Sequence, residues 1–181
     1  VRLAKITADE LLKDYFFKVD LRKPDIMFIS GVFGNTFFIL WAVIENANKA
    51  RKYRKYIHPA GLSPSAAASA VFLREEQDLY DPMCGCGTIP IEAFCIYSNL
   101  SLVAEVGKPV ISLLSKVYGI EQKTIINEVK EHIKTPSIRI AGSDISEKYI
   151  KQAMENYMIL IKLVKQYVNL QYDVKFFTSD I

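Results

Sequence analysis

The stretch from Leu79 to Phe94, LYDPMCGCGTIPIEAF, constrains the fold more than any other part of the chain. A short run with strand character ends at Asp81, a loop with two glycines follows, and a helix-like run begins near Thr88. Gly85 and Gly87 let the backbone turn sharply and approach a ligand without a Cβ in the way. The stretch therefore predicts a strand, a tight loop that faces a ligand, and a helix in succession.

The order of segments after residue 65 extends this unit to a layered α/β fold. Two more strand-like runs, 137–144 and 173–180, follow the first, and helix-like runs separate the three. Strands that alternate with helices predict a parallel sheet with right-handed crossovers. The long helix expected before the last strand has an apolar face formed by Ile150, Ala153, Met154, Tyr157, Ile161 and Val164.

Each predicted strand ends in an aspartate, at Asp81, Asp144 and Asp180. Ligands of such sheets bind beyond the carboxyl ends of the strands, so we expect the three acids at one site. Taken singly, each aspartate also fits an ordinary helix cap or turn residue. Their order at consecutive strand ends is what indicates a binding site.

The position of the first acid, Asp81, restricts which classes of ligand the loop could bind. No lysine follows Gly87, which argues against a P-loop, and the acid precedes the glycines, unlike the dinucleotide fingerprint. An acid at this place suits a ligand with a sulfonium and an ammonium, such as S-adenosylmethionine (SAM). Asp144 would then accept hydrogen bonds from both ribose hydroxyls, and Asp180 from the adenine amine.

Composition sets broader limits. The 181 residues are half hydrophobic and carry a formal charge of +3, which is globular and permits a nucleic-acid partner without requiring one. The three cysteines, Cys84, Cys86 and Cys95, lie too close together for a disulfide framework, and C-x-C lacks the usual zinc spacing. We expect packing cysteines, no metal and a reducing cytoplasm.

Two segments allow two interpretations each. The uncharged residues 26–44 predict either a membrane helix or, as we favour, a β-hairpin that turns at Gly34 and Asn35, so no membrane is expected. A basic run interleaved with Tyr53 and Tyr56 is either a solvated linker or a contact with RNA phosphate. The run comprises Lys49, Arg51, Lys52, Arg54 and Lys55.

Three segments together resemble the THUMP-domain RNA methyltransferases, above all the archaeal and bacterial branch that makes N2-methylguanosine in tRNA. The first is RKYRKYIHPAGLSPSAAASAV, residues 51–71, with its HPA-x-L-x-P pattern. The second is the glycine loop, where Cys86 replaces the serine usual in that family. The third is AGSDIS at 141–146, followed by Ala153 and Asn156 on the next helix.

The resemblance implies a domain plan and a cofactor site. Residues 65–181 would be the N-terminal portion of a class I (Rossmann-like) SAM-dependent methyltransferase domain. Residues 1–48 would be the C-terminal part of a THUMP-like RNA-binding domain, and 49–64 a basic linker. The implied cofactor-binding residues are Leu62, Ser63, Pro64, Ser65, Asp81, Pro82, Met83, Cys84, Gly85, Gly87, Thr88, Asp144, Ile145 and Asp180.

The resemblance also implies a reaction and a partner. The parent enzyme would methylate guanine N2 in tRNA, in the acceptor stem, with Arg51, Lys52, Arg54 and Lys55 contacting the RNA. The family's catalytic motif, Asn or Asp, Pro, Pro and an aromatic residue, does not occur in residues 1–181. We therefore expect a fragment truncated before that motif. The alternatives are a ribosomal RNA or DNA amino-methyltransferase of the same fold, or a non-catalytic RNA-binding relative.

Overall fold

The computed structural model consists of two compact units, Val1–Glu45 and Asn46–Ile181, each described by itself. Lys49 of the basic run and the predicted boundary between residues 48 and 49 lie outside the described residues. The structure describes residues 2–14, 18–20, 27–42, 51–75, 77–100, 107–165, 167–170 and 172–180.

The N-terminal unit contains a helix, α1 (Arg2–Asp14), and a hairpin of β1 (Met27–Phe33) and β2 (Thr36–Ala42). The strands are antiparallel and leave a two-residue turn, in which Gly34 has a φ of 58°. A glycine with positive φ at the first turn position is typical of a type II′ hairpin. The predicted hairpin is confirmed, and no helix among the described segments is long and apolar enough to span a membrane.

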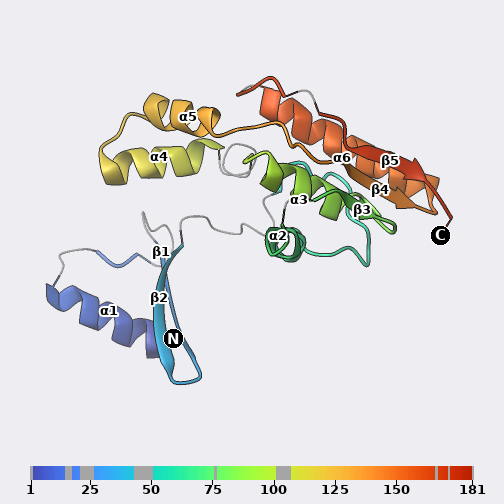
Figure 1. Ribbon diagram of the computed structural model, residues 1–181. Helices are drawn as coiled ribbons and strands as arrows, with labels where there is room; N and C mark the ends of the chain where they lie inside the picture. Colours follow the sequence, from blue (N-terminus) through green and yellow to red (C-terminus); the bar gives the residue numbers. More distant parts are fainter. Residues whose placement is uncertain are drawn as a thin grey trace. The chain divides into compact units, whose positions relative to one another are not determined.

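The second unit is built on a parallel sheet of β3 (Leu79–Asp81), β4 (Ile140–Asp144) and β5 (Lys175–Thr178), in the order β3-β4-β5 (Figure 1). The register pairs Asp81 with Gly142, and Asp144 with Thr178. The carboxyl ends of all three strands therefore lie at one edge of the sheet. This confirms the predicted parallel α/β fold, with shorter strands than the sequence runs suggested.

Helices cover the sheet and bring loops to its edge. α3 (Thr88–Tyr97) and α6 (Glu147–Lys165) pack against the strands, and α2 (Pro64–Phe72) packs against α3 (Figure 1). Two further helices, α4 (Gly107–Tyr118) and α5 (Gln122–Glu131), pack against each other and lie between α3 and β4 in the chain. The order of strands and helices matches the α/β alternation expected from the sequence.

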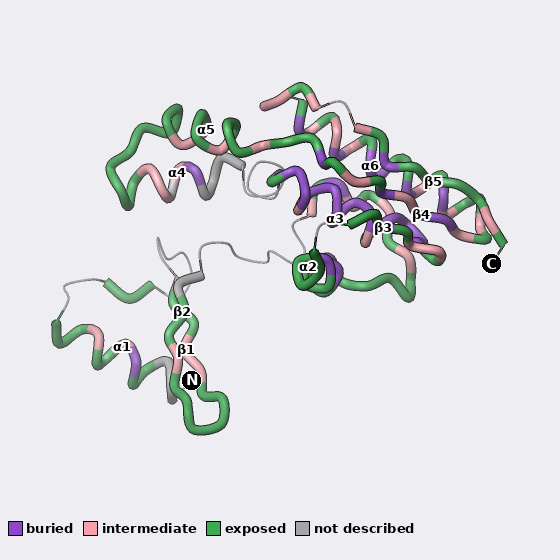
Figure 2. The backbone as a smooth tube through the Cα atoms, in the orientation of Figure 1, coloured by how far each residue is buried: buried purple, intermediate pink, exposed green. Residues whose placement is uncertain are grey.

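The core of this unit lies between the sheet, α3 and α6 (Figure 2). Phe94 is fully buried, and its ring meets Tyr157 edge-on at 5.4 Å and stacks on Tyr172 at 5.2 Å. The predicted buried face of α6 needs one correction, because Met154 is 50% exposed while the polar Asn156 is buried. The buried residues of this helix are Ile150, Ala153, Asn156, Tyr157, Leu160 and Val164.

Residues 51–63, here called the connector, belong to the second unit and are anchored to it by a buried carboxylate. The Tyr53 side chain is 1% exposed, and its hydroxyl donates a hydrogen bond to Glu92 Oε1 at 2.6 Å. Arg51 Nη2 donates to Glu92 Oε2 at 3.0 Å. Because Glu92 lies on α3, these contacts hold the start of the connector against the helix that follows the glycine loop.

Candidate functional site

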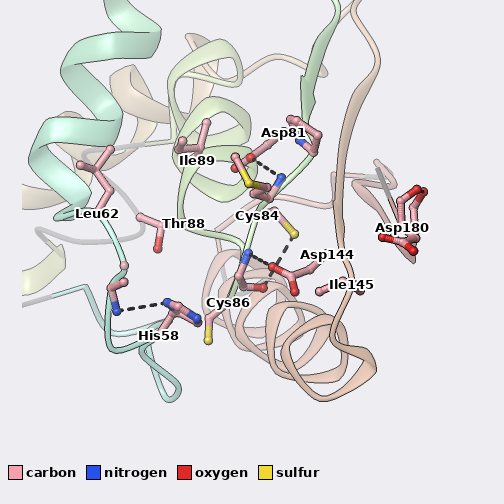
Figure 3. Close-up of a pocket in the computed structure, with 16 residues that line it drawn as sticks. His58, Leu62, Asp81, Cys84, Cys86, Thr88, Ile89, Asp144, Ile145 and Asp180 are labelled. Atoms are coloured by element: carbon pink, nitrogen blue, oxygen red, sulfur yellow. Dashed lines mark hydrogen bonds between the residues drawn. The ribbon is translucent and has the colours of Figure 1, made fainter.

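A pocket of about 610 Å³ lies where the three strands end (Figure 3). Its walls come from the connector, the glycine loop, the first turn of α3 and the residues that follow β4 and β5. The three predicted acids, Asp81, Asp144 and Asp180, all line it. The expectation that the strand-end aspartates meet at one place is therefore fulfilled by the geometry.

Two of the acids are held by backbone amides. Asp81 Oδ1 accepts from the N–H of Met83 at 3.1 Å. Asp144 accepts from Gly85 N–H at 3.0 Å through Oδ2 and from Ser146 N–H at 2.9 Å through Oδ1. Asp144 thus ties the end of β4 to the glycine loop and fixes both carboxylate oxygens at the pocket wall.

The surroundings of Asp81 shift the pKa of its carboxyl group. Burial raises its pKa above the ordinary value, the Met83 N–H opposes the rise, and the negative charge of Asp144 adds to it. Among the described residues, no positively charged side chain contributes to the pKa of Asp81. A cationic group of a ligand would supply a positive charge there.

The two glycines of the loop serve different purposes. Gly85 has a φ of 51° and lines the pocket, where a Cβ would stand 3.4 Å from the His58 side chain. Gly87 has a φ of 81°, and a Cβ there would stand 3.0 Å from Ala153 Cβ and 3.1 Å from the Phe176 ring. Gly87 is therefore required for packing of the loop against α6 and β5, whereas Gly85 borders the pocket.

Most, but not all, of the predicted cofactor residues line the pocket. Ser63, Pro64, Ser65 and Gly87 are not part of the lining: Ser63 caps α2 by accepting from Ala66 N–H at 3.2 Å, and Pro64 is buried in the first turn of that helix. The residues that do line it are Leu62, Asp81, Pro82, Met83, Cys84, Gly85, Thr88, Asp144, Ile145 and Asp180.

Some of the residues that line the pocket were not predicted from the sequence. The additional lining residues are His58, Ala60, Gly61, Cys86, Ile89 and Ser179. His58 and Ala60 belong to the HPA segment that helped to identify the family, which was a signal for a site role. The prediction of a basic linker over residues 49–64 does not include a contribution of the segment before Leu62 to the pocket.

The cysteines are packing groups. All three are buried, and none of them forms a disulfide. Burial and the nearby Asp81 and Asp144 charges raise the pKa of Cys84 to about 12, and burial raises the pKa of Cys86, whose Sγ donates to Gln152 Oε1 at 3.3 Å. Thiols with raised pKa values are poor nucleophiles. Within the described residues, no group of three or more His, Cys, Asp or Glu side chains is arranged to hold a metal ion.

The four basic residues predicted to contact RNA differ in their surroundings. Arg51 is paired with the buried Glu92, and its side chain is 18% exposed. Lys55 pairs with Glu155 on α6 at 3.0 Å, with both side chains about half exposed. Lys52 is exposed and Arg54 is partly buried. The contact of these residues with RNA stays a prediction.

A second set of hydrogen bonds, made by Asn156 of α6, joins the connector to the glycine loop. The buried Asn156 side chain accepts from Tyr56 N–H at 3.0 Å and donates to the Tyr56 carbonyl at 2.9 Å. The same amide nitrogen donates to the Cys86 carbonyl at 3.0 Å. Asn156 thus holds a backbone pair of the connector and a carbonyl of the glycine loop on one face of α6.

A glycine loop, three strand-end acids and a parallel sheet covered by α3 and α6 define a class I methyltransferase-type fold with a pocket at its strand ends. Residues 51–166 match the model of the RMKL-like methyltransferase domain family, and the chain belongs to that family.

Individual relatives agree with this membership. The chain is 28% identical over 173 residues to a tRNA (guanine(6)-N2)-methyltransferase of Methanocaldococcus jannaschii, an alignment that covers 86% of this chain and 43% of that protein. It is 33% identical over 87 residues to the Archaeoglobus fulgidus protein of the same name, covering 46% of this chain and 22% of that one. The chain therefore spans less than half the length of these relatives.

One solved structure has the same fold. The crystal structure of a possible methylase from Clostridium difficile 630 aligns with 98% of this chain and 45% of its own, at 25% identity and a TM-score of 0.58.

Proposed function

We propose that the protein containing this chain is a SAM-dependent methyltransferase and that the pocket at the strand ends holds SAM. The observation that carries the proposal is the meeting of Asp81, Asp144 and Asp180 around one pocket in a chain of the RMKL-like family. When bound, SAM would supply a methyl group on a positively charged sulfur.

The residues of the pocket fit this cofactor. Asp81 would bind the ammonium group, whose charge compensates the buried carboxylate. Each Asp144 oxygen accepts one backbone N–H and retains a second lone pair for a ribose hydroxyl. Ile145 would flank the adenine and Asp180 would accept from its amine. The first turn of α3 has no side-chain cap, so its positive end is available at Thr88 and Ile89.

We propose tRNA guanine N2 as the methyl acceptor. The support is the resemblance to the two archaeal relatives, whose names specify guanine 6 and therefore favour an acceptor-stem target. The aligned region covers 43% of the M. jannaschii protein, so we place the catalytic residues in the remainder of the full-length protein. Action on tRNA would also place the protein in the cytoplasm.

We propose that residues 1–48 are the C-terminal part of a THUMP-like RNA-binding domain. The separate compact unit Val1–Glu45 supports a domain boundary near this point. Residues 49–64 would connect it to the methyltransferase portion, 65–181. The exposed Lys52 and Lys55 are the basic residues best placed to meet phosphates.

The test uses the full-length protein and compares two aspartate variants, one inside the pocket and one outside it. Calorimetric titration with S-adenosylhomocysteine is expected to show binding, and Asp81→Asn is expected to weaken it by about tenfold or more because a charge-assisted hydrogen bond is lost. The matched control is Asp173→Asn, an exposed acid before β5 that lies outside the pocket lining, and it should bind like the wild type.

The acceptor is tested separately. Incubation of the enzyme with labelled SAM and tRNA, followed by mass spectrometry of the nucleosides, should reveal N2-methylguanosine. Methylation of ribosomal RNA or DNA in place of tRNA would overturn the tRNA assignment. Binding of tRNA with no binding of S-adenosylhomocysteine would identify a non-catalytic RNA-binding relative.

A further inference from the structure

The histidine of the connector borders the cofactor pocket and has no part in the function proposed so far. We propose that His58 is a cofactor-binding residue whose Nε2–H holds the carboxylate of the amino-acid end of SAM. This inference rests on the proposed function, since it assumes that SAM occupies the pocket.

Two contacts and the nearby glycine loop fix the orientation of the His58 ring. Its Nδ1 accepts from the backbone N–H of Ala60 at 3.1 Å. Its ring meets the Tyr149 ring edge-on, with centroids 4.3 Å apart. A Cβ built on Gly85 would lie 3.4 Å from His58 Cβ and Cγ and 3.6 Å from Cδ2, so the Cγ–Cδ2 edge of the ring, opposite Nδ1, lies beside the glycine loop. Nε2 is bonded to Cδ2 and therefore lies on the same edge of the ring; Figure 3 shows His58 and Cys86 among the residues that line the pocket.

The Ala60 contact also determines which ring nitrogen carries the hydrogen. A backbone N–H can only donate, so Nδ1 must be the unprotonated nitrogen of the neutral ring. The hydrogen then resides on Nε2. His58 thus presents a donor on the side of the glycine loop and has no free acceptor there, which argues against a role as a proton acceptor for the reaction.

The charge balance of the pocket explains what that donor would bind. Three carboxylates line the pocket, and among its described lining residues His58 is the one with a side-chain nitrogen. SAM carries a carboxylate as well as its two positive groups. Near Asp81 and Asp144 that carboxylate needs N–H donors, and the first turn of α3 at Thr88 and Ile89 supplies backbone amides on the same pocket. His58 adds a side-chain donor to this set.

The experiment compares two cofactors that differ in one group. Calorimetry on the full-length protein would measure the binding of SAM and of decarboxylated SAM, which has the same sulfonium and amine without the carboxylate. His58→Phe keeps a ring against Tyr149 and removes the donor, whereas His58→Gln keeps an N–H near the position of Nε2. The control is His132→Phe, at the other histidine of the chain, which is exposed at the end of α5 and whose Nδ1 donates to the Glu128 carbonyl at 2.8 Å.

We expect His58→Phe to weaken SAM binding by about tenfold or more, the usual effect of losing a hydrogen bond to a charged group. Decarboxylated SAM should bind to this variant and the wild type within about twofold. His58→Gln should recover part of the SAM affinity, and His132→Phe should change neither cofactor. Thermal melting of each variant would verify that it is folded.

Other outcomes distinguish a failure of this inference from a failure of the proposed function. Equal losses for both cofactors in His58→Phe would mean that the ring shapes the pocket without binding the carboxylate, and the inference would be overturned. Wild-type affinity for SAM in His58→Phe would overturn it as well. Failure of the wild-type protein to bind either cofactor would instead refute the proposed function.

Discussion

Removing the hydroxyl of Tyr53 tests whether the connector is anchored by a buried carboxylate. Tyr53 and Glu92 are 1% and 2% exposed, and the hydroxyl donates to Glu92 Oε1 at 2.6 Å. Tyr53→Phe keeps the ring in place and leaves that oxygen without its donor, while Arg51 still serves the other oxygen. A hydrogen bond to a charged group contributes about 1.5–3 kcal/mol, so the free energy of unfolding should fall by about 2 kcal/mol.

The loss should depend on pH in a defined direction. Burial raises the pKa of Glu92, and the Tyr53 hydrogen bond and the Arg51 charge oppose that rise. A carboxyl group with a raised folded pKa favours folding when protonated, so its contribution is complete below 4.5, its ordinary value, and is lost as pH rises through the folded value. Tyr53→Phe raises the folded pKa further. The difference between variant and wild type should therefore be small at acidic pH and grow as pH rises.

Urea unfolding at several pH values would measure both effects, with Tyr118→Phe as the control because Tyr118 is 63% exposed. The control should remain within about 0.5 kcal/mol of the wild type. A change below about 0.5 kcal/mol for Tyr53→Phe at neutral pH would refute the anchoring role. An equal loss at acidic and neutral pH would refute the electrostatic explanation.

Two further predictions concern the pocket and its support. Asn156→Ala removes the partner of three backbone groups, so it should lower the free energy of unfolding by about 3 kcal/mol. The control, Glu155→Ala, breaks an exposed ion pair and should lower it by less than about 1 kcal/mol. Similar losses for the two variants in urea unfolding would contradict this prediction. SAM affinity should fall as pH decreases through the raised pKa of Asp81, because the protonated acid no longer attracts the ammonium. Titration calorimetry across acidic pH would detect this, and a wild-type pH profile in Asp81→Asn would count against Asp81.

The parallel sheet and the meeting of its acids could be predicted because local patterns determine them. Strand-like runs alternate with helical ones, and parallel strands place their carboxyl ends at one edge. An aspartate at each such end must therefore lie near the others, whatever the details of packing. The glycines added the position of the loop, since a positive φ at Gly85 and Gly87 is readily adopted by glycine alone.

The faces of α6 show where periodicity is insufficient. Met154 lies about 100° around the helix from Ala153, at the margin of the apolar face, and the structure leaves it exposed. Asn156 lies about 60° from Ala153 on the other side and is buried. Its partners are backbone groups of the connector and the glycine loop, and a hydrophobicity pattern contains no information about such partners.

The connector could not be predicted for a similar reason. Its basic composition suggested an exposed segment, but Tyr53 is buried and Arg51 is paired with a carboxylate on α3. The sequence predicts that a charged residue in a helix is exposed to solvent unless a partner for it can be found nearby. The partners of Glu92 lie 39 and 41 residues earlier in the chain, so local patterns do not indicate them. The place of His58 in the pocket wall follows from that docking.

The amide of Asn156 has a consequence for how the pocket comes into being. It donates hydrogen bonds to carbonyl groups that lie 70 and 100 residues before it in the chain. Closing loops of that length costs conformational entropy before any contact repays it, and such contacts slow the folding of a domain. During synthesis, the glycine loop leaves the ribosome long before α6 exists to support it. The architecture thus makes formation of the pocket a late event, reached when distant stretches of the polypeptide have come into contact.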